Sequence, residues 1–124
     1  MRRLIEELRG IKLAIFDLDG VIYRGNALLD GVTDVIQNLK DLSIKVVYNS
    51  NNSTATRQTY VKRLKSFGID CSVDDFYTSA SIASAEITKI KPNAKIFIVG
   101  EIGLEQELKA AGHEVIIDES RCLE

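Results

Sequence analysis

Two carboxylates stand two residues apart near the start of the chain, directly after an apolar run. Residues 11–16 predict a buried strand of a parallel sheet, and Asp17 and Asp19 follow that strand. An extended backbone sends residues i and i+2 to one side, so both carboxylates can point at one small volume. Such a pair repels itself, and Mg²⁺ prefers hard oxygen ligands of this kind. The pattern favours a magnesium site, with a plain Asp-Gly turn at Gly20 as the alternative.

A second group of polar side chains follows the next apolar run. Residues 44–48 predict another buried strand, and residues 49–54 are six consecutive short polar side chains. Hydroxyls, amides and free N–H groups at a helix start favour an anion. The whole run of residues 49–54 is therefore a candidate phosphate-binding loop. The alternative is a loop with a helix cap at Ser53 or Thr54. Because each strand leads to a helix, both polar groups should lie on one edge of a parallel sheet.

The rest of the chain alternates between helical periodicity and short apolar runs, which predicts an α/β fold with a doubly wound parallel sheet. A short amphipathic helix is expected at residues 1–10, and a polar loop at residues 23–29. The later helices are expected at 32–42, 54–67, 79–91 and 104–111, and the later strands at 76–78, 94–99 and 114–117. Small side chains in the helix after residue 79 should pack against the sheet.

Composition indicates an ordinary globular protein with a single domain over residues 1–124. The chain has 124 residues, of which 45% are hydrophobic and 27% charged, with a formal net charge of −2. That charge gives no electrostatic argument for nucleic acid or anionic membranes. No secretory signal and no apolar run of membrane length is present, so a cytoplasmic location is expected.

The cysteines and the single histidine lack the spacing of a metal site. Cys71 and Cys122 lie far apart with no second cysteine or histidine near either, so they are expected to be buried or incidental thiols. His113 follows Gly112, and we expect it at a solvated helix terminus rather than at a ligand.

With both polar groups in place, the chain resembles the haloacid dehalogenase (HAD) superfamily of phosphatases, and within it the NagD or 4-nitrophenylphosphatase branch. Residues 17–21 match the first family motif, DxDGV, and residues 22–25 are similar to its extension in this branch. Residues 50–53 match the second motif, a Ser or Thr followed by two asparagines. Residues 77–80 and 98–101 also resemble the branch. The resemblance implies a HAD-type Rossmann-like core and Mg²⁺-dependent hydrolysis of a small phosphorylated substrate.

The resemblance also implies roles for individual residues. Asp17 would be the nucleophile that forms an aspartyl-phosphate. Asp19 would protonate the leaving oxygen and then deprotonate the attacking water. Mg²⁺ would bind the Asp17 carboxylate and the Asp19 carbonyl. The implied substrate-binding residues are Gly20, Ser50, Asn51 and Asn52.

Two family motifs have no assigned residue in this chain. The lysine of the third motif and the acidic pair of the fourth follow a large cap domain, and the resemblance would place the start of that cap near Glu124. Ala55 stands where the family often has an arginine. We therefore expect an incomplete core, without the cap, and weak or undetectable activity from this chain alone. A halved sheet would leave an inner strand unpaired, so a second copy or a complementary C-terminal chain is the expected partner.

Two other functions are compatible with parts of the pattern. A non-catalytic module that binds phosphate, Mg²⁺ or a partner subunit is the main alternative. A receiver-type signalling domain is disfavoured, because it needs an acceptor aspartate where this chain has Gly100 and Glu101.

Overall fold

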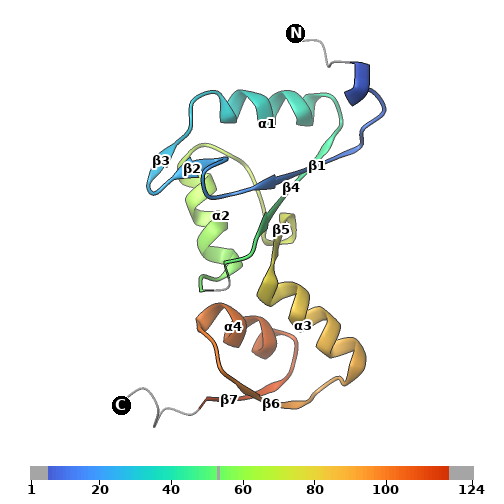
Figure 1. Ribbon diagram of the computed structural model, residues 1–124, viewed down its shortest axis with the longest axis vertical. Coiled ribbons are helices and arrows are strands. Elements are labelled where there is room, and N and C mark those ends of the chain that lie inside the picture. The colour runs from blue at the N-terminus through green and yellow to red at the C-terminus, as the bar shows by residue number, and fades with distance from the viewer. Residues whose placement is uncertain (1–5, 53, 118–124) are drawn as a thin grey trace.

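A three-stranded parallel sheet forms the centre of the upper half of the molecule (Figure 1). The computed structural model describes residues 6–52 and 54–117. The sheet has the order β1-β4-β5, in which β1 is Leu13–Asp17, β4 is Lys45–Ser50 and β5 is Phe76–Thr78. Parallel pairing of β1 with β4, and of β4 with β5, confirms the predicted α/β class.

Two helices cover one face of this sheet. Helices α1 (Val32–Asp41) and α2 (Arg57–Ser66) bury apolar side chains against the face that carries Val46 and Tyr48. The stacked rings of Tyr48 and Phe76, with centroids 4.9 Å apart, lie at the middle of this core. The core is therefore one-sided, because both helices lie on the same side of the sheet.

Helix α2 begins later than the sequence predicts. Thr56 caps it, because its hydroxyl accepts the N–H of Thr59 at 3.3 Å. The expected cap at Thr54 is therefore wrong, and Ser53 lies outside the described residues. As a result, the polar residues after β4 form a loop of their own before the helix starts.

The second half of the chain forms a separate layer. It contains α3 (Ser79–Ile90), β6 (Lys95–Ile98), α4 (Ile102–Ala110) and β7 (Glu114–Ile117). Strands β6 and β7 pair in parallel with each other and do not join β1-β4-β5, so the expectation of one continuous sheet is wrong here. The small face of α3 packs on α4 instead of the central sheet: the Ser84 hydroxyl donates to the Glu107 carbonyl at 3.1 Å. Figure 1 shows this layer as the lower half of the molecule.

Short elements replace two of the predicted segments. A small antiparallel hairpin, β2 (Tyr23–Arg24) and β3 (Ala27–Leu28), stands where a polar loop is expected. Of the expected N-terminal helix, the described part holds only a short 3₁₀ helix, Glu6–Leu8. A second 3₁₀ helix, Val73–Asp75, precedes β5. None of the helices within residues 6–52 and 54–117 is both long and apolar enough to cross a bilayer.

His113 is buried, which corrects the prediction of a solvated position. Its side chain is 5% exposed, and its Nδ1 accepts the N–H of Ala94 at 3.0 Å. Its Nε2 lies 2.9 Å from the Thr88 hydroxyl, which donates its own proton to the Ser84 carbonyl at 2.7 Å. Nε2 therefore carries the proton and the ring is neutral. His113 joins α3 to the starts of β6 and β7.

The prediction for the cysteines is confirmed for Cys71, which is a buried free thiol. Burial raises the pKa of this thiol, because the thiolate would lose its hydration. Cys122 lies outside the described residues.

Candidate active site at the carboxyl edge of the sheet

The two predicted polar groups lie at the ends of adjacent parallel strands. Asp17 is the last residue of β1 and pairs in register with Asn49 of β4, one residue before Ser50. Ser50 in turn pairs with Thr78, the last residue of β5. Because the strands are parallel, all three carboxyl ends lie on one edge of the sheet, as the sequence predicts. Ligands of open α/β sheets bind outside this edge.

The turn after β1 presents both carboxylates to solvent. Leu18 is completely buried, whereas Asp17 and Asp19 on either side of it are exposed. One oxygen of Asp17, Oδ1, accepts the N–H of Leu18 at 2.9 Å, which leaves Oδ2 as the free oxygen. Gly20 has a φ of 79° and donates its N–H to the Tyr23 carbonyl at 2.8 Å. The left-handed backbone at this turn is the reason for a glycine.

Hydrogen bonds within the loop after β4 fix its shape. Ser50 is buried, and its hydroxyl oxygen accepts the N–H of Asn52 at 3.1 Å. The side-chain oxygen of Asn52 accepts both the N–H and the hydroxyl of Thr54, at 2.9 and 2.6 Å. Asn52 is thereby left with only its amide NH₂ as a side-chain donor. Asn51 is exposed, so its polar groups face the solvent beside the strand end.

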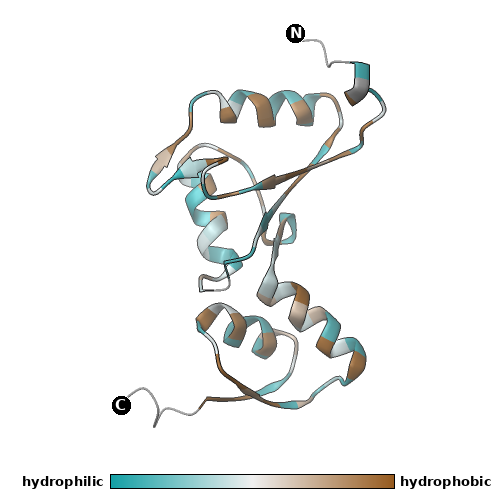
Figure 2. Ribbon diagram, viewed as in Figure 1, coloured by the Kyte–Doolittle hydropathy of each residue, from teal (hydrophilic) through white to brown (hydrophobic). Residues whose placement is uncertain are grey.

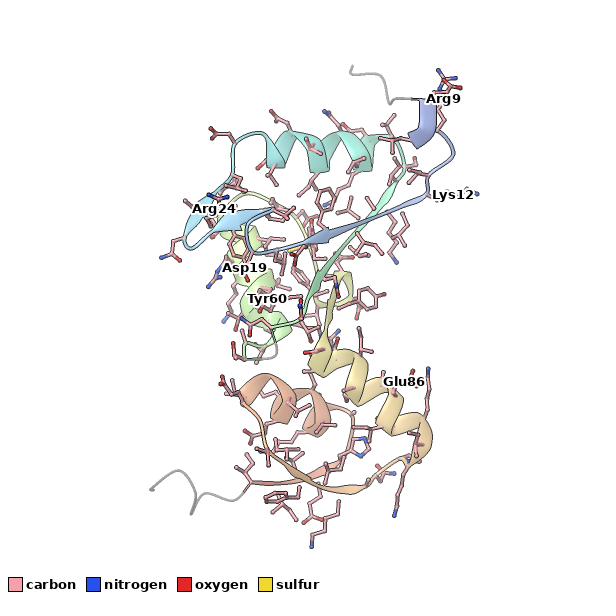
Figure 3. All side chains as sticks on the ribbon, viewed as in Figure 1. Arg9, Lys12, Asp19, Arg24, Tyr60 and Glu86 are labelled. Atoms are coloured by element: carbon pink, nitrogen blue, oxygen red, sulfur yellow. The ribbon has the colours of Figure 1, made fainter. Side chains whose placement is uncertain are left out.

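Two residues of neighbouring helices, Tyr60 and Ser79, also contact this loop. The Tyr60 hydroxyl of α2 donates to the Asn52 carbonyl, and the Ser79 hydroxyl at the start of α3 donates to the Asn51 carbonyl, each at 3.5 Å. Both bonds are long and therefore weak. Figure 3 labels Tyr60 on α2 and Asp19 in the turn after β1. The helical periodicity of residues 54–67 gave no signal for the contact of Tyr60.

Tyr23 lies beneath the acidic turn. Its hydroxyl is buried without a hydrogen-bond partner among the described residues, and the guanidinium carbon of Arg63 lies 5.1 Å from its ring centre. Burial raises the pKa of Tyr23, and the negative charge of Asp19 adds to this effect, while Arg63 opposes it. Tyr23 therefore stays protonated at neutral pH. No sequence pattern indicated this arrangement.

The acidic turn exposes oxygen donors of the kind that Mg²⁺ binds. The exposed carboxylates of Asp17 and Asp19 are hard oxygen donors of the type that Mg²⁺ binds, usually through one or two carboxylates together with waters and substrate phosphate. Over residues 6–52 and 54–117, no three His, Cys, Asp or Glu side chains are grouped so that they could hold a metal ion. The donor set fits Mg²⁺ chemically but is incomplete in the described part of the chain.

Comparisons with known proteins agree on one family. The model of haloacid dehalogenase-like hydrolases matches residues 14–114. A 4-nitrophenylphosphatase of Schizosaccharomyces pombe is 35% identical over 101 residues, which are 79% of this chain and 34% of that protein. A sugar-phosphatase of Bacillus subtilis is 36% identical over 98 residues, which are 79% of this chain and 36% of that protein.

A solved structure agrees in fold as well as in sequence. The p-nitrophenyl phosphatase from Archaeoglobus fulgidus superposes with a TM-score of 0.80 and 37% identity, covering 86% of this chain and 41% of that one. The chain therefore belongs to the haloacid dehalogenase-like hydrolases, in the branch of NagD and the 4-nitrophenylphosphatases. It spans about a third of the two curated relatives and matches their N-terminal part. Members of this family generally use Mg²⁺.

Proposed function

We propose that this chain carries the nucleophile of a Mg²⁺-dependent phosphate monoester hydrolase that works through an aspartyl-phosphate. The observation that supports this most directly is the register that pairs Asp17 with Asn49, beside Ser50. A carboxylate and a group of hydroxyl and amide donors then lie at adjacent strand ends. The family supports the reaction class, and the relatives named above act on 4-nitrophenyl or sugar phosphates according to their names.

Asp17 attacks the phosphorus in line with the leaving oxygen. Its Oδ1 is held by the Leu18 N–H, so Oδ2 is the attacking atom. A P–O bond to Asp17 forms, the P–O bond to the alcohol breaks, and Asp19 gives its proton to the leaving oxygen. In the second half, Asp19 takes a proton from water, the water attacks phosphorus, and Asp17 is released with inorganic phosphate.

The loop after β4 holds the phosphoryl oxygens during both steps. Ser50 donates its hydroxyl, whose oxygen already accepts the Asn52 N–H, and the N–H of Asn51 and the NH₂ of Asn52 add further donors. Gly20 keeps the acidic turn in shape through its bond to the Tyr23 carbonyl. Mg²⁺ held by the Asp17 carboxylate and the Asp19 carbonyl would offset the charge of the phosphoryl group.

The main alternative is a non-catalytic module that binds phosphate, Mg²⁺ or a partner. The incomplete donor set favours it: three clustered metal-ligating side chains are absent from residues 6–52 and 54–117. Each missing charged group should remove several kcal/mol of transition-state stabilisation. We therefore predict slow hydrolysis by this chain alone. A cytoplasmic location and the absence of nucleic-acid partners stay predictions from the sequence.

Hydrolysis of p-nitrophenyl phosphate tests the proposal. We expect a rate that depends on Mg²⁺ and is lost in Asp17→Asn, together with acid-stable phosphate incorporation that requires Asp17. Asp70→Asn, which removes an exposed carboxylate away from the sheet edge, is the matched control and should retain the rate. Hydrolysis that survives Asp17→Asn would remove the nucleophile role. If this chain is mixed with a complementary C-terminal chain and then binds phosphate but hydrolyses no substrate, the result would favour the non-catalytic module.

A further inference from the structure

Two buried hydroxyls, those of Tyr23 and Tyr48, have no hydrogen-bond partner among the described residues. Tyr23 is 0% exposed and Tyr48 1% exposed, so neither hydroxyl reaches the surface. A buried hydroxyl without an acceptor lowers the stability of a fold, and a phenylalanine of the same shape would avoid that loss. The two tyrosines therefore differ in consequence only if one of them has an acceptor that can come within reach.

The surroundings of Tyr23 hold its ring in place. The ring centre lies 5.9 Å from that of Phe67 and 5.1 Å from the guanidinium carbon of Arg63. The backbone carbonyl of Tyr23 accepts the N–H of Gly20 at 2.8 Å. Arg63 carries only N–H donors, so it cannot accept the hydroxyl proton of Tyr23. An acceptor for this proton must therefore come from a side chain that moves toward the ring.

Asp19 has a free carboxylate and lies next to Tyr23. A backbone bridge joins the two residues. The Asp17 carboxylate accepts the Leu18 N–H, whereas no hydrogen bond to the Asp19 carboxylate is present among residues 6–52 and 54–117. Burial raises the pKa of Tyr23, and the negative charge of Asp19 raises it further, so the two groups lie within electrostatic reach of each other. An unpartnered donor and an unpartnered acceptor are thus neighbours.

The surface around Asp19 leaves its side chain free to rotate. Asp19 is exposed, and the strand before it is exposed as well: Ile15 is 64% and Leu13 47% exposed, which corrects the prediction of a fully buried strand. Figure 2 shows hydrophobic colour along β1. An exposed side chain changes rotamer within nanoseconds. Asp19 can therefore adopt the orientation toward Tyr23 at little cost.

We propose that Tyr23 is a positioning residue for Asp19: its buried hydroxyl donates to a carboxylate oxygen of Asp19 and holds that carboxylate in one orientation at the sheet edge. The bond gives the hydroxyl its acceptor and orients the acid at the same time. Its role in hydrolysis rests on the proposed function, in which Asp19 gives a proton to the leaving oxygen and takes one from water. Such transfers need the carboxyl group within hydrogen-bond reach of the reacting oxygen. The bond itself does not require hydrolysis.

Tyr48 provides the matched control, because the carboxylate that acts on it is already engaged. Burial raises the pKa of Tyr48, and the charges of Cys71 and Asp75 add to this effect. The Asp75 carboxylate, however, accepts the N–H of Ser72 at 2.9 Å. Tyr48 belongs to the apolar core on β4 and takes no part in the acidic turn. Removal of its hydroxyl is the same chemical change without a free acceptor nearby.

Urea denaturation of the 124-residue chain tests the bond. Tyr23→Phe should raise the equilibrium constant of unfolding about fivefold, as for a hydrogen bond of average strength. Tyr48→Phe, which removes an unpartnered hydroxyl, should leave this constant unchanged or lower it. In an Asp19→Ala background, Tyr23→Phe should no longer raise the constant, because the acceptor is gone. If Tyr23→Phe fails to raise it, or raises it equally with and without the Asp19 carboxylate, the proposal is wrong.

Hydrolysis of p-nitrophenyl phosphate with Mg²⁺ tests the role of the bond in the reaction. Tyr23→Phe should lower kcat about tenfold and leave KM within about twofold, because the hydroxyl orients the acid and does not bind the substrate. Tyr48→Phe should keep both constants. An unchanged kcat in Tyr23→Phe would overturn the positioning role. A chain without measurable hydrolysis would remove the proposed function, while the urea measurements still decide whether Tyr23 holds Asp19.

Discussion

At the scale of single residues, the acidic turn depends on backbone geometry as much as on its carboxylates. Gly20 has a positive φ, and its N–H holds the turn to the Tyr23 carbonyl. This bond keeps Asp17 and Asp19 exposed on either side of the buried Leu18. The carboxylates therefore need no packing of their own to be presented at the sheet edge.

Gly20→Ala should lower the free energy of unfolding by about 1 kcal/mol, because alanine is strained in the left-handed region. A Cβ at this position would meet no atom within 4 Å, so the loss comes from the backbone alone. Gly20→Asn should lower the free energy of unfolding by less, since asparagine tolerates this conformation better than alanine does. Urea denaturation measures both variants. Equal losses for alanine and asparagine would contradict the backbone explanation.

Cys71 should make stability fall at alkaline pH. Burial raises the pKa of its thiol in the folded chain above the unfolded value of about 8.5. As the pH rises, the unfolded chain loses this proton before the folded chain does. The contribution of the thiol to the free energy of unfolding is therefore complete below about pH 8.5 and is lost as the pH rises further. In a Cys122→Ser background, stability should fall more steeply from pH 8 to 10 with Cys71 than with Cys71→Ala. Equal slopes would show that the thiol does not contribute.

At the scale of elements, the hydrogen bonds of His113 hold the second layer together. The ring joins Thr88 of α3 to the backbone of Ala94 just before β6. His113 itself precedes β7, so one side chain fixes three segments. This connection explains why a histidine beside a helix end is buried here.

His113→Ala should lower the free energy of unfolding by about 2 kcal/mol, because it leaves the buried N–H of Ala94 without an acceptor. Thr88→Val should also lower the free energy of unfolding, because it leaves the Nε2–H of His113 without its acceptor. The double variant should lower the free energy of unfolding by about 1 kcal/mol less than the sum of the two single effects, because Thr88 and His113 share a hydrogen bond. Thermal denaturation of the four proteins gives this coupling. Strict additivity would mean that the two side chains act independently.

The elements were predicted more successfully than their association. Helical periodicity and apolar runs are local, so α1, α3 and β7 appear close to their expected bounds. The partners of His113 lie 25 and 19 residues away, and no local pattern shows them. The separate pairing of β6 and β7 depends on where α3 packs, which is also non-local. At the candidate site, the motifs identified the strand-end residues, but the buried hydroxyl of Tyr23 had no signal.

At the scale of the whole molecule, one partly buried ion pair joins the two halves. Arg57 of α2 contacts Glu107 of α4 through two bonds, Nε to Oε1 at 2.5 Å and a terminal nitrogen to Oε2 at 3.1 Å. Such a two-point contact fixes direction as well as distance. The layer of α3, α4, β6 and β7 is thereby oriented against the sheet that carries the candidate site.

Glu107→Gln should loosen this orientation and lower stability by about 1 kcal/mol, because the guanidinium of Arg57 loses its countercharge. Hydrogen exchange should quicken in α4 and β7 more than in β4. Glu86→Gln, which removes an exposed pair with Lys89, is the matched control and should change little. Uniform changes across both halves would argue against a local link.

The central claim is that the ends of β1 and β4 form one phosphoryl site. Amide spectra of the 124-residue chain, titrated with Mg²⁺ and beryllofluoride as a mimic of aspartyl-phosphate, test it most directly. We predict joint shifts at Asp17, Asp19 and Gly20 and at Asn51 and Asn52, all abolished by Asp17→Asn. Shifts confined to one of the two segments, or shifts that persist in Asp17→Asn, would contradict the claim.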